Sequence, residues 1–232
     1  MSLAATAHAL QRPPGKVFLL RLALGALVLI AAAWLFGAIA EDVVNKDAPL
    51  GTIDLNVATW LHAHATPART ALMFFTSDLG APLTVLAMAS VTAIFLLWKR
   101  QRYQLLLLLL AVPGGALLNV IVKQLIHRDR PIFDDPIQTL TSYSFPSGHA
   151  MGSTVFYGTL AAIVVWRVRD GRVHALAIGA AGLLIGLICF SRIYLGVHYL
   201  SDVTAGFLAG VVWLGASLFA VAALRHRNTR AP

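Results

Sequence analysis

A histidine and an aspartate at helical spacing are the residues of this sequence best suited to nucleophilic chemistry. His198 and Asp202 are four positions apart. On a helix, the carboxylate can then accept a hydrogen bond from one ring nitrogen while the other nitrogen faces outward. That is the relation between an activated histidine and the group that orients it. A second histidine, His149, opens a different apolar segment.

Two cations, a serine and a glycine have the types and spacing suited to binding a phosphate group. Lys123 and Arg130 are seven positions apart, so they share a face if their helix continues that far. Arginine offers forked donors to phosphate oxygens, and lysine offers a compact charge. Ser147 and Gly148 precede an apolar helix, whose free N–H groups and dipole favour an anion. Glycine also lets the backbone approach the anion closely.

The segments that carry these residues are too apolar for a water-soluble protein. The 232 residues are 58% apolar and 12% charged, with a mean hydropathy of +0.76, whereas globular domains average about 45–50% and about 25%. A membrane span needs roughly 20 apolar residues. We therefore expect one all-α domain over residues 1–232, a polytopic bundle without a separate soluble domain. Six transmembrane helices are predicted, over residues 17–40, 82–98, 103–126, 147–166, 173–190 and 199–224.

Two further features belong to this plan. Asp78, Gly80 and Pro82 interrupt the apolar stretch that leads into the second span. Residues 55–64 suggest a short helix at the membrane interface. With six spans, the ends that carry the two histidines, the aspartate and the cations meet on one side of the bilayer.

Basic residues set the predicted orientation. Twelve of the 18 Lys and Arg residues fall at one set of span ends, which the positive-inside rule assigns to the cytoplasm together with both termini. The site then faces the outer side of the inner (cytoplasmic) membrane. The net charge of +8 thus needs no nucleic acid as a partner. The twelve are Arg12, Lys16, Arg21, Lys99, Arg100, Arg102, Arg167, Arg169, Arg172, Arg225, Arg227 and Arg230.

Several alternatives accompany this plan. The run that ends at Ala38-Ile39-Ala40 resembles a signal peptide, but its apolar stretch is longer than usual, so we expect the first span to be retained. Two Gly-xxx-Gly pairs, which begin at Gly182 and Gly206, favour close packing within the bundle, and a homodimer interface stays open. Cys189 is expected to be a small buried apolar residue without a disulfide partner.

Three motifs resemble the signature of the type 2 phosphatidic acid phosphatases. They are Lys-x6-Arg-Pro from Lys123, Pro-Ser-Gly-His from Pro146, and Ser-Arg-x5-His-x3-Asp from Ser191. All eleven fixed positions match in order. The family also includes bacterial phosphatidylglycerophosphate and undecaprenyl pyrophosphate phosphatases and the vanadium haloperoxidases.

The resemblance implies a helical-bundle fold and a role for each residue. His198 would attack phosphorus and become a phosphohistidine, with Asp202 holding its tautomer, and His149 would protonate the leaving oxygen and then activate water. The expected substrate is a lipid phosphomonoester or pyrophosphate, such as phosphatidic acid, phosphatidylglycerophosphate, undecaprenyl pyrophosphate or a lipid A phosphate. No metal or cofactor is expected, because cations neutralise the phosphate. The phosphate-binding set would be Lys123, Arg130, Ser147, the Gly148 backbone and Arg192.

Two other functions compete with this one. A vanadate-dependent oxidase would use the same anion site, but such relatives are soluble. A transporter would carry its charges at mid-membrane depth, whereas here they lie at helix ends. His62 and His64 point to different faces of a helix and are interpreted as surface residues. Solvated interface positions are predicted for His127, Arg128 and Asp129, with contact to lipid headgroups as the alternative. Tyr143 and Phe145 are assigned either to a lipid entrance or to interfacial anchoring.

Overall fold

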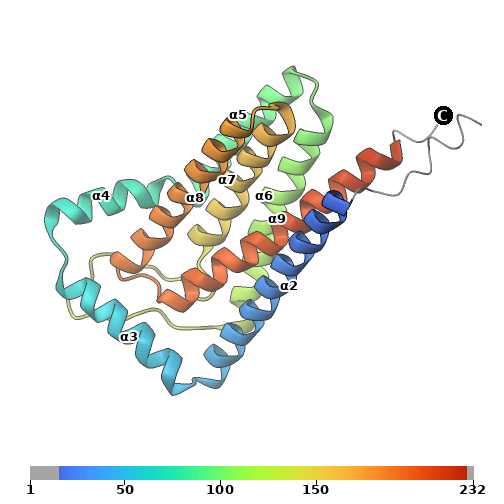
Figure 1. The fold of residues 1–232 in the computed structure, drawn as a ribbon. Helices are drawn as coiled ribbons and strands as arrows, with labels where there is room; N and C mark the ends of the chain where they lie inside the picture. Colours follow the sequence, from blue (N-terminus) through green and yellow to red (C-terminus); the bar gives the residue numbers. More distant parts are fainter. Residues whose placement is uncertain (1–15, 229–232) are drawn as a thin grey trace, which may run out of the picture.

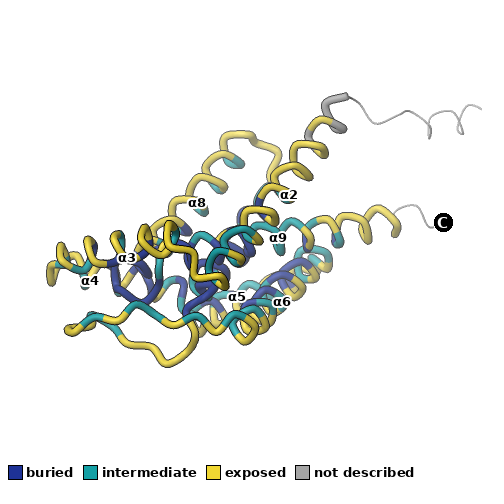
Figure 2. The backbone as a smooth tube through the Cα atoms, turned by 90° about the horizontal axis from the view of Figure 1, so that it is seen from below, coloured by how far each residue is buried: buried dark blue, intermediate teal, exposed yellow. Residues whose placement is uncertain are grey.

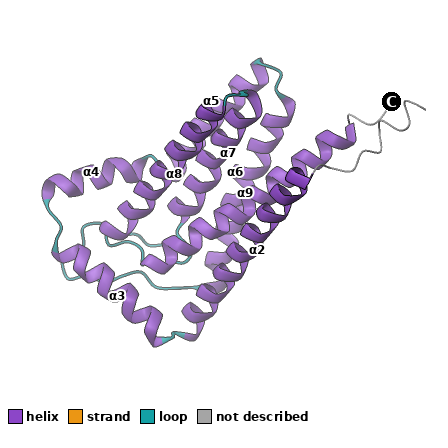
Figure 3. Ribbon diagram, in the orientation of Figure 1, coloured by secondary structure: helices purple, strands orange, loops and turns teal. Residues whose placement is uncertain are grey.

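The computed structural model describes residues 16–228, and every regular element in that range is a helix (Figures 1 and 3). Two basic residues of the topology prediction, Arg12 and Arg230, lie outside the described residues, as do the side chains of Lys16 and Arg21. The helices are α2 (Lys16–Asn45), α3 (Ala48–Ala63), α4 (Pro67–Asp78), α5 (Pro82–Trp98), α6 (Arg102–Ile126), α7 (Gly148–Arg167), α8 (Gly171–Tyr194) and α9 (Leu200–Asn228).

The six predicted spans correspond to α2, α5, α6, α7, α8 and α9. Five of these helices are long and apolar enough to cross a membrane by themselves. Two of the six helices begin at residues that favour a helix start. Pro82 is in the first turn of α5, and the Asp170 side chain accepts a hydrogen bond from the Arg172 N–H at the start of α8. The all-α polytopic fold is confirmed.

The second span is a bent pair of helices. α4 and α5 meet at an angle of 43°, and together they form the sixth candidate span. The break falls at residues 79–81, where Gly80 packs so closely against Ile188 that an added Cβ would lie 2.5 Å from the Ile188 side chain. The Tyr157 hydroxyl donates to the Leu79 carbonyl at 2.8 Å and thus holds a backbone acceptor left free by the break. The interruption predicted at Asp78, Gly80 and Pro82 is therefore a bend between two helices, held by contacts with α7 and α8.

α7 is the central helix of the bundle. Half of its most apolar window is buried, compared with 6% for α2 and 11% for α8, and Figure 2 shows buried residues gathered inside the bundle. The outer helices expose large apolar side chains such as Trp34, Leu83 and Phe219, each more than 65% exposed. Apolar side chains facing outward around a bundle of this length are expected where lipid, not water, is the surrounding solvent.

Close packing fixes α9 against α7 and α2. Gly206 faces the Ser147 carbonyl and Gly210 faces Thr154, so this Gly-xxx-Gly pair packs within the bundle as predicted. Gly215 packs against Leu29, which places the first span beside α9. Gly182 is different, because it is exposed and nothing lies within 4 Å of an added Cβ there.

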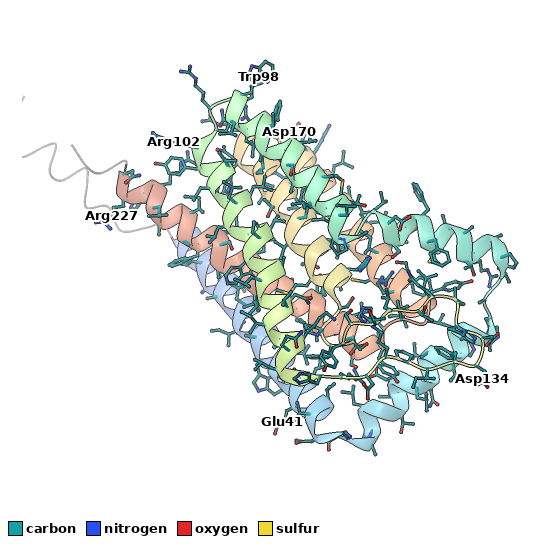
Figure 4. All side chains as sticks on the ribbon, turned by 180° about the vertical axis from the view of Figure 1, so that it is seen from behind. Glu41, Trp98, Arg102, Asp134, Asp170 and Arg227 are labelled. Atoms are coloured by element: carbon teal, nitrogen blue, oxygen red, sulfur yellow. The ribbon has the colours of Figure 1, made fainter. Side chains whose placement is uncertain are left out.

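The two ends of the bundle differ in content. Figure 4 shows Trp98, Arg102, Asp170 and Arg227 at one end, and Glu41 and Asp134 at the opposite end. The long connection between α6 and α7, residues 127–147, runs across this second end beside α3 (Figures 1 and 3). All three motifs reach the same end, as the six-span plan predicts.

Candidate active site at one end of the bundle

A histidine and a carboxylate form the centre of this end. His198 is 2% exposed and precedes α9, and Asp202 is fully buried in the first turn of that helix. The His198 Nδ1 atom lies 3.5 Å from Asp202 Oδ2 and 3.3 Å from Ser144 Oγ. The Ser144 hydroxyl donates to the same carboxylate oxygen at 2.5 Å, and the Tyr199 N–H donates to it at 2.9 Å. These contacts orient the imidazole, so that Nε2 is the nitrogen left for chemistry.

Electrostatics keep this imidazole neutral. Burial lowers the pKa of His198 to about 4, although Asp202 opposes the shift. Nε2 lies 3.2 Å from an Arg130 guanidinium nitrogen, which can donate to the unprotonated ring nitrogen. Burial also lowers the pKa of Arg130 from its ordinary value. A neutral, oriented histidine is therefore in contact with a cation.

Arg130 and Lys123 reach the site in different ways. α6 ends at Ile126, and His127 takes a left-handed conformation with φ 52°, so the two cations do not share a helical face as the sequence suggested. Arg130 instead reaches the site from the connection, where it donates to the carbonyls of Ser142, Tyr143 and Val197. Lys123 donates to the carbonyls of Tyr143 and Ser144 at 2.5 and 3.2 Å. Both cations thus hold the backbone that leads into α7.

Arg192 has donors to spare. Its side chain is 1% exposed at the end of α8, and one nitrogen donates to Ser77 Oγ at 2.5 Å and to Gln138 Oε1 at 3.3 Å. Its Nε and second terminal nitrogen are buried without a hydrogen-bond partner. Because unpaired buried donors on a charged group are costly, they mark a place where an acceptor of opposite charge would bind.

The start of α7 completes the arrangement. Ser147 is the N-cap and accepts from the Ala150 N–H at 3.4 Å, while its own N–H donates to the Asp202 carbonyl at 2.9 Å. An added Cβ on Gly148 would lie 3.1 Å from the Asn119 side-chain oxygen, so a larger residue here would press on Asn119. His149 follows, close enough to Arg192, His198, Arg130 and Lys123 for each to act on it electrostatically. Within the described chain, the His149 side chain has no hydrogen-bond partner.

Sequence reasoning missed two members of this end and misassigned a third. Asp54 of α3 is 1% exposed, and Ser144 is fully buried. Arg128 was assigned to solvent, and that assignment is wrong: its guanidinium lies between two buried carboxylates, 2.6 Å from Asp202 Oδ1 and 2.8 Å from Asp54 Oδ2. Asp54 follows an unremarkable stretch of sequence, so only its charge within a membrane-protein helix could have singled it out.

Other predicted residues take simpler roles. His62 stacks on Phe133 and pairs with Asp135 at 2.8 Å, whereas His64 stacks on Trp60, so the two histidines have separate neighbours. Phe145 is fully buried, which excludes both roles proposed for it at the surface. In the part of the chain that the structure describes, no three His, Cys, Asp or Glu side chains are grouped to hold a metal ion.

A cavity of about 380 Å³ adjoins this cluster. It lies between the connection and the turn before α9, and Arg130, Gln138, Ser142, Tyr143 and Val197 are among its lining residues. Two of these are close to His198: Arg130 contacts its ring, and Val197 precedes it in the chain. His198, His149 and Arg192 do not themselves line the cavity.

Comparison with known proteins identifies the family of this chain. Residues 104–226, more than half of the chain, match the model of the PAP2 superfamily. Phosphatidylglycerophosphatase B of Bacillus subtilis is 34% identical over 137 residues, which are 59% of this chain and 67% of that protein. Undecaprenyl-diphosphatase of Sulfolobus acidocaldarius is 32% identical over 145 residues, 60% and 64% of the two chains. The chain thus spans about two thirds of the length of these two relatives.

A solved structure matches over most of the fold. The crystal structure of a transmembrane PAP2-type phosphatidylglycerolphosphate phosphatase from Bacillus subtilis superimposes with a TM-score of 0.77 at 26% identity, covering 88% of this chain and 98% of that one. Family match, sequence likeness and fold point the same way. The chain belongs to the PAP2 superfamily and is an integral membrane phosphatase.

Proposed function

We propose that this phosphatase hydrolyses a phosphomonoester or pyrophosphate carried by a lipid, through a phosphohistidine on His198, at the outer face of the membrane. The observation that carries the proposal is Arg192, a fully buried cation with two unpaired donors beside two histidines. A phosphate dianion would accept from both donors and from Arg130. Phosphoryl transfer needs mainly such positioning and neutralisation of charge.

In the first half-reaction, the His198 Nε2 lone pair attacks phosphorus and the bond from phosphorus to the lipid oxygen breaks. The substrate oxygens take over the Arg130 donor that faces Nε2 at 3.2 Å in the free enzyme. Asp202 and Ser144 hold Nδ1–H, so the charge that forms on the ring is stabilised. His149, which takes up a proton when the phosphate dianion binds among the surrounding cations, gives that proton to the departing oxygen.

In the second half-reaction, neutral His149 removes a proton from water as that water attacks the phosphohistidine. The bond from phosphorus to Nε2 breaks, inorganic phosphate leaves, and His149 is again protonated. The Ser147 side chain and the free N–H groups of Gly148 and His149 at the start of α7 would hold the oxygens through both steps. Every residue in this cycle comes from the end of the bundle described above.

A lipid is the substrate class that best fits the surroundings. The relatives are named for phosphatidylglycerophosphate and undecaprenyl diphosphate, both lipids. The cavity that Arg130 lines is partly open, and large apolar side chains such as Leu125 and Ile132 are exposed nearby in the sequence. A headgroup can occupy the cavity while its tail stays against the lipid-facing helices.

Rapid-quench kinetics on p-nitrophenyl phosphate tests the two histidine roles. His198→Ala should lose all turnover and form no phosphoenzyme. His149→Ala should release a burst of nitrophenol, because nitrophenolate leaves without a proton, and should then stall as an acid-labile, base-stable phosphoprotein. A burst in His198→Ala but not in His149→Ala would mean that the roles are reversed.

Substrate and metal dependence are tested on the same purified protein. Phosphate release from a panel of lipid phosphates in detergent should exceed release from soluble phosphomonoesters. Because Lys123, Arg130 and Arg192 supply the positive charge, activity should persist in EDTA, and vanadate should inhibit it. Loss of activity in EDTA with recovery in magnesium would contradict this mechanism.

A further inference from the structure

A buried ionic network lies behind the catalytic pair and ties it to α3. Arg128 donates from one terminal nitrogen to Asp202 Oδ1 and Ser201 Oγ, both at 2.6 Å, and from the other to Asp54 Oδ2 at 2.8 Å. Its guanidinium also lies over the Tyr199 ring, 4.4 Å from the ring centre. One arginine therefore bridges two carboxylates that come from helices far apart in the sequence.

Asp54 contributes to the start of α9 as well. Its Oδ1 accepts from the Ser201 N–H at 2.9 Å, and its Oδ2 accepts from the Ser201 hydroxyl. The first turn of a helix has N–H groups without intrahelical partners, and a carboxylate there is favoured by the helix dipole. Asp54 thus acts as a cap supplied by α3 to the helix that carries Asp202.

The network engages both terminal nitrogens of Arg128, although the side chain also lines the cavity beside Arg130. Both of its terminal nitrogens are directed at carboxylates, and its face is covered by Tyr199. Burial lowers the pKa of Arg128, but Asp202 and Asp54 raise it by more, so the net shift is upward. Its charge is matched to these two acids and differs in this respect from the unpaired donors of Arg192.

We propose that Arg128 and Asp54 are positioning residues that hold Asp202 ionised and turned so that its Oδ2 faces His198. Arg128 takes Oδ1, which leaves Oδ2 for Ser144, the Tyr199 N–H and the imidazole. Removing Arg128 would leave Asp54 and Asp202 as two buried carboxylates without a cation between them, and repulsion would favour a proton on one of them. A protonated or turned Asp202 would no longer stabilise the charge that forms on His198 during attack.

The inference rests on the proposed function. It predicts that the double variant at Arg128 and Asp54 has a higher kcat than the single variant at Arg128. Arg128→Met should lower kcat by about 100-fold, in the range seen when a group behind a catalytic ligand or histidine is removed. Its KM and vanadate inhibition constant should change by less than about threefold, because both terminal nitrogens of Arg128 are directed at carboxylates. Adding Asp54→Asn to Arg128→Met should recover about tenfold in kcat, because it removes one of the two unpaired charges.

The experiment measures kcat, KM, vanadate inhibition and thermal midpoint for Arg128→Met, Asp54→Asn, the double variant and Arg128→Lys. Asp47→Asn, an exposed acid near the start of α3, is the matched control and should behave like the wild type. Arg128→Lys keeps the charge but cannot bridge both acids, so an intermediate kcat with unchanged KM is expected. If Arg128→Met does not fold, the kcat and KM of Arg128→Lys test the proposal instead.

Three outcomes would overturn the inference. A double variant no better than Arg128→Met would show that the two acids are not coupled through the arginine. A rise in KM and in the vanadate constant at unchanged kcat would make Arg128 a phosphate-binding residue. A lower thermal midpoint with normal kcat in every variant would show that the network stabilises the position of α3 and does not affect catalysis. An inactive wild-type protein would instead contradict the proposed function itself.

Discussion

At the scale of single residues, the burial of His198 should make the protein sensitive to acid. The unfolded histidine titrates near its ordinary pKa of about 6.5, whereas burial lowers the native pKa to about 4. Above both values the imidazole is neutral in both states. Between them the unfolded chain binds a proton that the native site excludes, so native stability falls as pH decreases through this window.

A comparison of variants isolates this contribution. The thermal midpoint in detergent should fall between about pH 7 and pH 5, and it should fall less in His198→Gln, which cannot titrate. His174→Gln at the other end of the bundle serves as the matched control and should keep the wild-type pH dependence. An equal acid-induced drop in the wild type and His198→Gln would show that this histidine is not the group responsible.

Arg192 should be the most costly cation to replace. Its two unpaired donors are available for phosphate, and loss of one preorganised donor to a developing charge typically lowers kcat by about 10²–10³-fold. Arg192→Gln is therefore expected to lose at least that much, together with a weaker response to vanadate. Arg192→Lys should recover only part of the loss, because lysine lacks the fork. The control is Arg69→Gln, an exposed cation on the predicted outer side. Similar kcat in Arg192→Gln and Arg69→Gln would remove Arg192 from the site.

The motif residues could be predicted from sequence because their types and spacings are specific to phosphate chemistry. The residues behind them could not. Asp54 is 74 positions from Arg128 and 147 from Ser201, and no local pattern connects these three. Ser144 was missed because a serine before a Pro-Ser-Gly-His motif has no distinguishing spacing. Such contacts depend on how α3 folds back over the end of the bundle, which is a tertiary property.

At the scale of helices, the contact between α7 and α9 should be the one least tolerant of added volume. An added Cβ at Gly206 would lie 2.6 Å from the Ser147 carbonyl, and Ser147 is both the N-cap of α7 and bonded to the Asp202 carbonyl. Gly206→Ala must therefore separate α7, which carries His149, from α9, which carries Asp202. Overpacking of this kind typically costs about 1–3 kcal/mol, so both the thermal midpoint and kcat should fall.

Gly182→Ala is the matched control on α8. Nothing lies within 4 Å of its added Cβ, and alanine is favoured over glycine in a helix by roughly 0.5–1 kcal/mol. Its thermal midpoint should be unchanged or higher, and its kcat normal. If Gly206→Ala were equally harmless, the close contact of α9 with Ser147 would not be a constraint on the site.

Helix positions could be read from hydropathy to within a few residues, but the path of the chain beyond the helix ends could not. The third predicted span begins one residue from the start of α6 and ends with it at Ile126, since a long apolar run has no other way to satisfy its backbone in lipid. The left-handed turn at His127 and the path of Arg130 depend on contacts with residues 142–144 and 197. Sequence periodicity does not contain these contacts, so it placed Arg130 on a continuation of the helix that the structure does not have.

At the scale of the whole molecule, the candidate site and most of the basic residues occupy opposite ends. Trp98, Arg102 and Arg227 mark one end, and Asp134 in the connection marks the other (Figure 4). The ionisable residues of the three motifs lie at this second end, not along the middle of the helices. A transport path would need charges through the bundle, so the arrangement favours chemistry at a membrane surface.

The predicted orientation puts the site end outside the cell membrane, and labelling can test it. Thr141 is exposed in the connection between α6 and α7, and Arg169 is exposed in the turn between α7 and α8 at the opposite end. After Cys189, the only cysteine, is replaced, Thr141→Cys should react with an impermeant maleimide in intact cells. Arg169→Cys should react only after permeabilisation, because the positive-inside rule assigns its end to the cytoplasm. The reverse pattern would place the site in the cytoplasm, so that its lipid substrate would have to come from the inner leaflet.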